Sequence, residues 1–127
     1  MAANNELEDF CETAIGPACV DFASRIGADE PSRLTGGTRV GYEVRLPSAY
    51  KDAGERSVIV CAEPFDDEAF TVKSSRPDTP DQLRQIALVR YESLKDSSKA
   101  AEETMRIRAS IGESLEALRE SLSNRTS

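Results

Sequence analysis

The stretch from Thr79 to Leu122 constrains the fold more than any other part of the chain, because it predicts one very long helix or two helices in series. Thr79-Pro80-Asp81-Gln82 has the form of a capping box, with Thr79 at the N-cap and Pro80 at the first helical position. The 40 residues after Gln82 contain no proline and a single glycine, Gly112. No residue in this stretch therefore forces a helix to stop.

A heptad frame runs through this stretch, with apolar residues at eight of its twelve core positions. Polar residues weaken the middle of the frame, and the C-terminal part is the most regular. There the apolar side chains recur at steps of four, four, three and four residues, and we call them the apolar row: Ile107, Ile111, Leu115, Leu118 and Leu122. We expect the apolar row to be a protein interface, because an exposed row of leucines is costly and sticky.

Helix length leaves two arrangements open. An unbroken helix from residue 79 to residue 122 would be on the order of 65 Å long. The preceding 78 residues would form a body of roughly 30 Å across, so much of the helix would project and its apolar row would need a second chain. Alternatively, the helix breaks at Asp96-Ser97-Ser98 and restarts near Lys99, which would fold the apolar row back onto the body.

The N-terminal segment predicts an amphipathic helix. Its apolar side chains recur at steps of three and four: Leu7, Cys11, Ile15, Ala18 with Cys19, Phe22 and Ile26. Pro17 removes one backbone hydrogen bond and crowds the carbonyl of Thr13, so we expect one kinked helix or two short helices that end near Gly27. Cys11 and Cys19 lie on the apolar face, which predicts buried, structural thiols.

Residues 27–37 have the composition of a linker, and three strands follow. Residues 38–46 alternate cleanly, with Val40, Tyr42, Val44 and Leu46 on one face. Residues 57–62 lack alternation, which is typical of a strand that is covered on both faces or placed centrally, and residues 69–73 alternate again. The sequence therefore predicts an α+β fold with a three-stranded antiparallel sheet between an N-terminal helix and a long C-terminal helix or helical pair.

Charge divides the chain into two predicted units. Residues 1–78, a small acidic body, carry 15 acidic and 8 basic side chains, whereas residues 79–127, a helical arm partly packed on the body, carry 8 of each. This distribution argues against direct nucleic-acid binding and favours a basic protein partner. The acidic turn of Glu63, Asp66, Asp67 and Glu68 is a possible contact surface, and it lacks the residue spacing of a calcium loop.

We expect no catalytic residues, cofactor or metal site. The chain contains no histidine, and its three cysteines show no C-x-x-C spacing. We also expect no contact with a membrane and a cytoplasmic location, because no apolar run is long enough to span a bilayer and residues 1–6 do not resemble a signal peptide.

Three functional hypotheses remain. The first is a non-enzymatic interaction or assembly module, a homo-oligomer or a docking protein that uses its C-terminal helix, such as a subunit of a viral or bacterial complex. The second is an acidic inhibitor or a secretion-type chaperone that binds another protein, which rests on composition alone. The third is a small enzyme. A mass measurement in solution would separate an assembly module from the other two.

Overall fold

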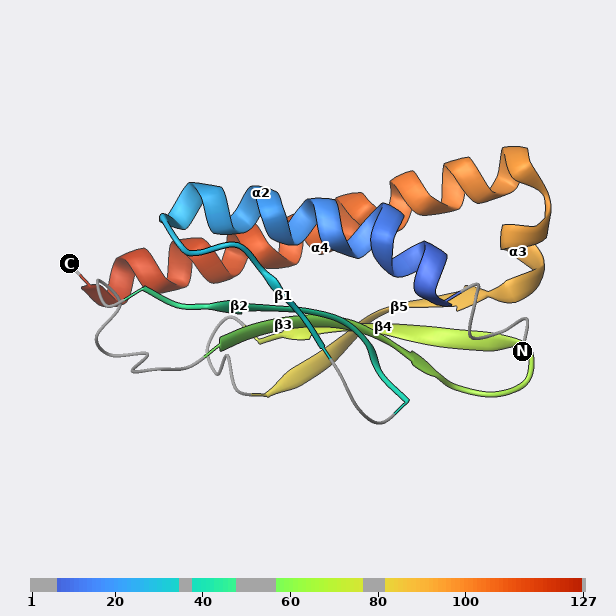
Figure 1. The fold of residues 1–127 in the computed structure, drawn as a ribbon, viewed down its shortest axis with the longest axis horizontal. Coiled ribbons are helices and arrows are strands. Elements are labelled where there is room, and N and C mark those ends of the chain that lie inside the picture. Colours follow the sequence, from blue (N-terminus) through green and yellow to red (C-terminus); the bar gives the residue numbers. More distant parts are fainter. Residues whose placement is uncertain (1–6, 35–37, 48–56, 77–81, 127) are drawn as a thin grey trace.

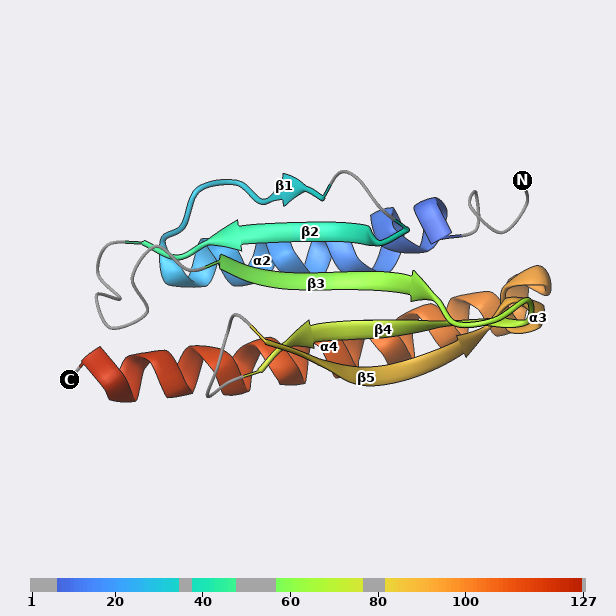
Figure 2. The same cartoon turned by 90° about the horizontal axis from the view of Figure 1, so that it is seen from below.

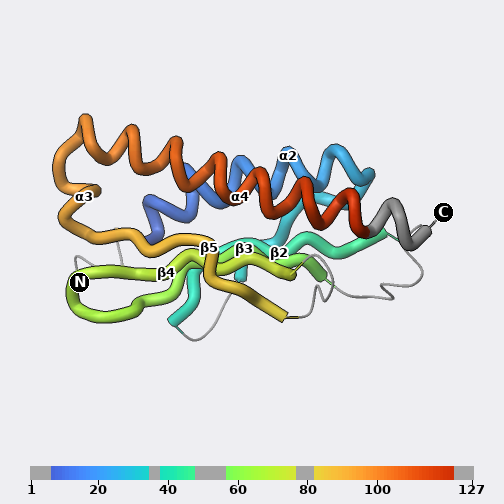
Figure 3. Tube along the Cα trace, turned by 180° about the vertical axis from the view of Figure 1, so that it is seen from behind, coloured from blue at the N-terminus to red at the C-terminus, as the bar shows by residue number. Residues whose placement is uncertain are grey.

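The two longest helical segments lie side by side on the same face of an antiparallel sheet (Figure 1). The computed structural model describes residues 7–34, 38–47, 57–76 and 82–126, with side chains described as far as residue 121. The order of elements is helix, five strands and two helices. Seen from behind, both helical segments again lie above the sheet, and a short helix connects the sheet to the C-terminal one (Figure 3).

The sheet has five strands rather than the three expected from the sequence. They are β1 (Ser32–Arg33), β2 (Val40–Arg45), β3 (Ser57–Pro64), β4 (Ala69–Ser75) and β5 (Leu83–Arg90). Each strand pairs antiparallel with the next, so β3 is central and β1 and β5 are the two edges. β1 lies within the predicted linker of residues 27–37.

Alternation along β2, β3 and β4 divides the sheet into two faces. Val44, Val58 and Phe70 point toward the helices and are buried in the hydrophobic core. Their neighbours along each strand point to the opposite face, because successive side chains of a strand alternate. The alternation predicted for β2 and the central position predicted for β3 are confirmed.

The N-terminal helix is continuous from residue 7 to Ile26, contains a π-helical segment, and bends near its start, as Figure 1 shows. Residues 7–10 are α-helical, η1 (Cys11–Ile15) is π-helical, and α2 runs over Gly16–Ile26. The wider π turn ends at Ile15, two residues before Pro17, which cannot donate a backbone hydrogen bond. The helix ends at Gly27, whose φ of 71° is left-handed and therefore suits glycine.

Residues 83–90 form a strand where the sequence predicted a helix. β5 pairs with β4 from Ser75 opposite Leu83 to Ala69 opposite Arg90, with a register shift at Val72/Lys73. The predicted boundary at residue 78 therefore falls between two neighbouring strands of one sheet. The proposed capping box lies outside the described residues apart from Gln82.

The helical stretch breaks at Asp96, as the second arrangement of the sequence analysis required. α3 covers Tyr91–Lys95 and α4 covers Ser97–Thr126. Asp96 Oδ1 accepts hydrogen bonds from the backbone N–H groups of Ser98, at 3.0 Å, and Lys99, at 3.3 Å. Asp96 thus caps the N-terminus of α4 and satisfies donors that have no partner within the helix.

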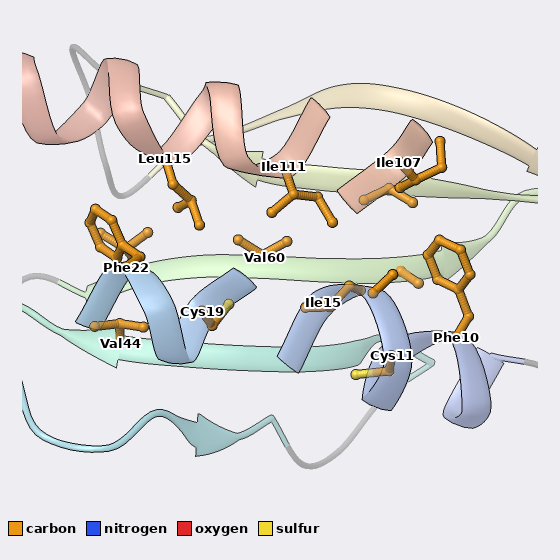
Figure 4. Close-up of a cluster of buried hydrophobic side chains, with 14 of the residues drawn as sticks. Phe10, Cys11, Ile15, Cys19, Phe22, Val44, Val60, Ile107, Ile111 and Leu115 are labelled. Carbon is orange, nitrogen blue, oxygen red and sulfur yellow. The ribbon is translucent and has the colours of Figure 1, made fainter. Parts of the chain in front are cut away.

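The core lies between the sheet and the two helical segments. Figure 4 shows Ile111 and Leu115 of α4 directed toward the N-terminal helix, with Val60 of β3 between the two helical segments. The apolar row is thus part of the chain's own core: Ile107, Ile111 and Leu118 are 0 % exposed and Leu115 is 3 % exposed. The side chain of Leu122 lies outside the described part.

Candidate protein-interaction surface

A groove of about 620 Å³ lies between α2, the segment that follows the helix, and β2. We call it the α2 groove. Helical residues form one wall, and the segment after the helix and one β2 side chain form the other. Its lining residues are Glu12, Gly16, Pro17, Val20, Asp21, Ser24, Glu30, Pro31 and Tyr42.

The floor of the α2 groove depends on a close contact between Tyr42 and the backbone of Gly16. A Cβ atom at Gly16 would lie 3.2 Å from Cε2 of the Tyr42 ring, so glycine allows the ring to rest against the helix. The guanidinium of Arg33 lies 5.3 Å from the centroid of the same ring, within the range of a cation–π interaction. Tyr42 is therefore held between the helix and β1.

The α2 groove combines an acidic rim with an exposed apolar side chain. Glu12 lies 3.9 Å from Arg33, and Asp21 is paired at 3.1 Å with Arg25. Glu30 has no ion pair among the described residues, and the lining contains no lysine or arginine. Val20 is 53 % exposed although it is a branched apolar residue in the middle of a helix. A surface with these features matches a ligand that is both apolar and positively charged.

Sequence analysis did not identify this surface, because its residues come from a helix, a loop and a strand. The available signal was Val20, which lies off the apolar stripe of its helix and among acidic neighbours.

The predicted acidic surface divides into two parts. Asp66, Asp67 and Glu68 lie together at the exposed turn between β3 and β4, where Asp66 Oδ1 accepts a hydrogen bond from the Glu68 backbone N–H at 2.8 Å. Phe65, at the same turn, is 64 % exposed. Glu63 belongs to a different environment, as a strand residue on the face of the sheet opposite the helices.

Two cationic side chains contact Glu63 on that outer face. It accepts a hydrogen bond from Arg39 Nε at 2.6 Å and lies 3.7 Å from Lys73 Nζ. The hydrogen bond from Arg39 holds the pKa of Glu63 below its usual value. Glu63 therefore stabilises the pairing of neighbouring strands and is already satisfied within the chain.

All three thiols are buried, and the burial of Cys11 and Cys19 was expected from the sequence. Cys11 and Cys19 lie in the core beneath the N-terminal helix, where burial raises the pKa of Cys11 to about 11 and that of Cys19 to about 12. Cys61 lies on the outer face of the sheet, between Gly41 and Lys73 of the flanking strands. Burial also raises the pKa of Cys61, so each thiol is protonated at neutral pH.

Four residues of the predicted interface, Ile107, Ile111, Leu115 and Leu118, are buried together in the core of the single chain. Among the exposed residues of α4, Met105 is the most prominent apolar side chain, at 73 % exposure. No cluster of three or more potential metal ligands occurs among the described residues. Nor does any helix in the described part have the length and hydropathy needed to cross a membrane.

Comparisons with known proteins give no family for the chain. No family model matches it, and neither the curated proteins nor the solved structures contain a significant match. The physical features of the surface are therefore the basis for a functional proposal.

Proposed function

We propose that this protein is a non-enzymatic docking module that binds a basic, amphipathic helix of a protein partner in the α2 groove. The observation that supports this proposal most strongly is that the exposed Val20 and Glu30, which has no ion pair among the described residues, line the same groove. An apolar anchor surrounded by carboxylates matches a helix with alternating leucine-like and lysine-like side chains. Binding of such a helix along a groove is a recurring mode of peptide recognition.

The state of the potential nucleophiles supports a role in binding rather than in catalysis. Each thiol is buried and has a raised pKa, so none is available as a thiolate at neutral pH. The chain has no histidine that would serve as a general base near neutral pH. The carboxylates of the α2 groove are suited to holding a cationic side chain.

The packing of α4 against the sheet leads us to place the docking site elsewhere than on the C-terminal helix. The apolar row that suggested docking through the C-terminal helix is used to hold that helix on the sheet. We therefore assign partner binding to the α2 groove, on the flank of α2 next to β2. The acidic turn at Asp66, Asp67 and Glu68 is the competing surface for a basic partner, and the experiment must separate the two.

Peptide binding to matched charge-reversal variants tests the proposal. The probe is a fluorescein-labelled amphipathic helix of leucine and lysine with about five turns, and the same peptide with glutamate in place of lysine is the negative control. Glu30→Lys should weaken binding of the lysine peptide by roughly five- to tenfold, because a favourable charge interaction becomes repulsive. Fluorescence anisotropy at low and physiological salt measures the change.

Asp67→Lys is the matched control, because it changes the net charge equally at an exposed position of the β3–β4 turn. We expect this substitution to weaken peptide binding only slightly, because a charge far from the groove is screened by salt. Equal weakening by Asp67→Lys and Glu30→Lys would show non-specific attraction to an acidic protein. Stronger weakening by Asp67→Lys would move the site to the β3–β4 turn. Either result would contradict the proposal.

A further inference from the structure

The two edges of the sheet differ in length. β1 has two residues, whereas β5 has eight. β5 pairs only with β4 among the described strands, and Figure 2 shows no described element beside its free side. A long edge is a template for pairing with another strand, and β5 has two features that restrict such pairing: the extra residue Ile86 at the register shift and the inward-pointing Arg84.

The side chains of β5 point to the outer or the helix-covered face in an order that is the same from either end of the strand. Leu83, Gln85, Leu88 and Arg90 lie on the outer face, because they oppose Ser75, Lys73, Thr71 and Ala69. Arg84, Ala87 and Val89 lie on the helix-covered face, opposite Ser74, Val72 and Phe70. Ile86 is the extra residue at the register shift and packs against the core. From residue 83 the order is outer, inner, outer, inner, inner, outer, inner, outer.

This pattern selects one antiparallel register between two copies of β5. With the two-fold axis between Ile86 and Ala87, every outer residue faces an outer residue and every inner residue faces an inner one. Gln85 then lies opposite Leu88 of the second copy, and Leu83 lies opposite Arg90. A shift by one residue pairs inner with outer positions and breaks the match, because side-chain direction alternates along a strand.

Charge restricts the contact between two copies of β5, because the strand carries Arg84 and Arg90 and no acidic residue. The arginines of β5 lie toward its ends, and the four central residues from Gln85 to Leu88 are uncharged. In the selected register no two arginines face each other directly, so the like-charge penalty of cross-strand pairs is avoided. The net charge of −7 resides in residues 1–78, and the segment that contains β5 and α4 is balanced.

We propose that two copies of this chain associate through antiparallel pairing of β5, which joins their five-stranded sheets into one. This inference is independent of the α2 groove. The groove includes Tyr42 of β2, near the β1 edge, whereas the self-association surface is the opposite edge. The dimer therefore leaves both grooves open, and a partner with two basic helices would gain affinity from bivalent binding.

Sedimentation equilibrium of charge variants on the outer face tests both the dimer and its register. The double variant Gln85→Arg with Leu88→Arg places arginine opposite arginine at two symmetric pairs and should weaken the dimer by roughly tenfold or more. The double variant Gln85→Arg with Leu88→Glu places arginine opposite glutamate at the same pairs and should restore the dimer. Both positions are exposed in the single chain, so the fold should tolerate either change.

The matched control is Val20→Arg with Met105→Arg, which replaces two exposed side chains away from β5 and should leave the dimer intact. A wild-type chain that remains a monomer at millimolar concentration would overturn the proposal. A dimer that resists the arginine pair, or that the arginine–glutamate pair fails to restore, would also overturn it. Circular dichroism of each variant verifies that the monomer is folded.

Discussion

At the residue scale, small side chains allow the layers of this protein to approach each other closely. Gly16 lets the Tyr42 ring rest against α2, and Gly41 lets β2 lie against β3. A Cβ atom at Gly41 would lie 2.2 Å from the Val60 carbonyl oxygen and 2.6 Å from Cys61 Cα. No backbone can approach a Cβ so closely, so the local pairing depends on glycine.

Gly41→Ala should lower the free energy of unfolding by about 2–3 kcal/mol, because the strands must separate to admit the methyl group. Gly112→Ala is the matched control: it adds the same methyl group within α4, where no atom lies within 4 Å of the new Cβ. That change should stabilise the protein by up to about 1 kcal/mol through helix propensity. Urea unfolding measures both, and a Gly41→Ala variant as stable as wild type would refute the packing argument.

The buried thiols predict a loss of stability at alkaline pH. The pKa of Cys19 rises from 9.0 to about 12 on folding, chiefly through burial and then through Cys11, so the folded state holds this proton more tightly than the unfolded state. The stability that the thiol contributes is complete below pH 9 and is lost as the pH rises from about 9 toward 12.

Cys19→Ala should make the stability of the protein less dependent on pH between 9 and 11 than it is in wild type. Tyrosines and lysines titrate in both proteins, so their contribution to the pH dependence of stability cancels when the two are compared. Urea unfolding at several pH values provides the measurement, and parallel pH profiles for the two proteins would contradict the burial of Cys19.

At the element scale, alternation and helical periodicity predicted the parts of the fold whose signals are regular. β2 alternates without a fault, and the N-terminal stripe from Leu7 to Ile26 is buried as expected. β5 was missed because the consecutive inward residues Ile86 and Ala87 break the period of two. Leu83, Ala87 and Arg90 also fit the heptad spacing, so the same residues satisfied a helical pattern.

The candidate surface was hidden from sequence analysis for a different reason. Glu12, Val20, Glu30 and Tyr42 are distant in sequence, and only the packing of α2 beside β1 and β2 makes them neighbours. The apolar row was recognised, but spacing alone does not distinguish a helix packed on its own sheet from a helix packed on a second chain. Burial of Ile107, Ile111 and Leu118 to 0 % exposure identifies their contacts as internal.

Substitutions in the apolar row distinguish these two arrangements. Leu118→Ala should lower the free energy of unfolding by about 2–5 kcal/mol, as expected for a cavity in a packed core. Leu118→Asp should unfold the chain, because it buries an unpaired carboxylate. Met105→Ala on the exposed face of α4 is the control and should change stability by less than about 0.5 kcal/mol. A folded Leu118→Asp variant with altered oligomeric state would instead indicate an interface.

At the scale of the whole molecule, both helical segments cover one face of the sheet. The α2 groove and β5 lie toward opposite edges of that sheet. The α2 groove lies near the β1 edge, and the open strand β5 forms the other edge. This separation would let the chain bind a basic partner on one side while it pairs with a second copy on the other. The docking role of the α2 groove is the central claim of this account.

NMR titration of the ¹⁵N-labelled protein with the leucine–lysine helical peptide tests that claim most directly. Docking in the α2 groove predicts saturable shift changes at the amides of Glu12, Val20, Asp21 and Glu30, with little change at Asp66, Asp67 and Glu68. The glutamate-substituted peptide should cause no changes at either place. Shift changes concentrated at the β3–β4 turn, or spread evenly over the acidic surface without saturation, would contradict the proposed docking site.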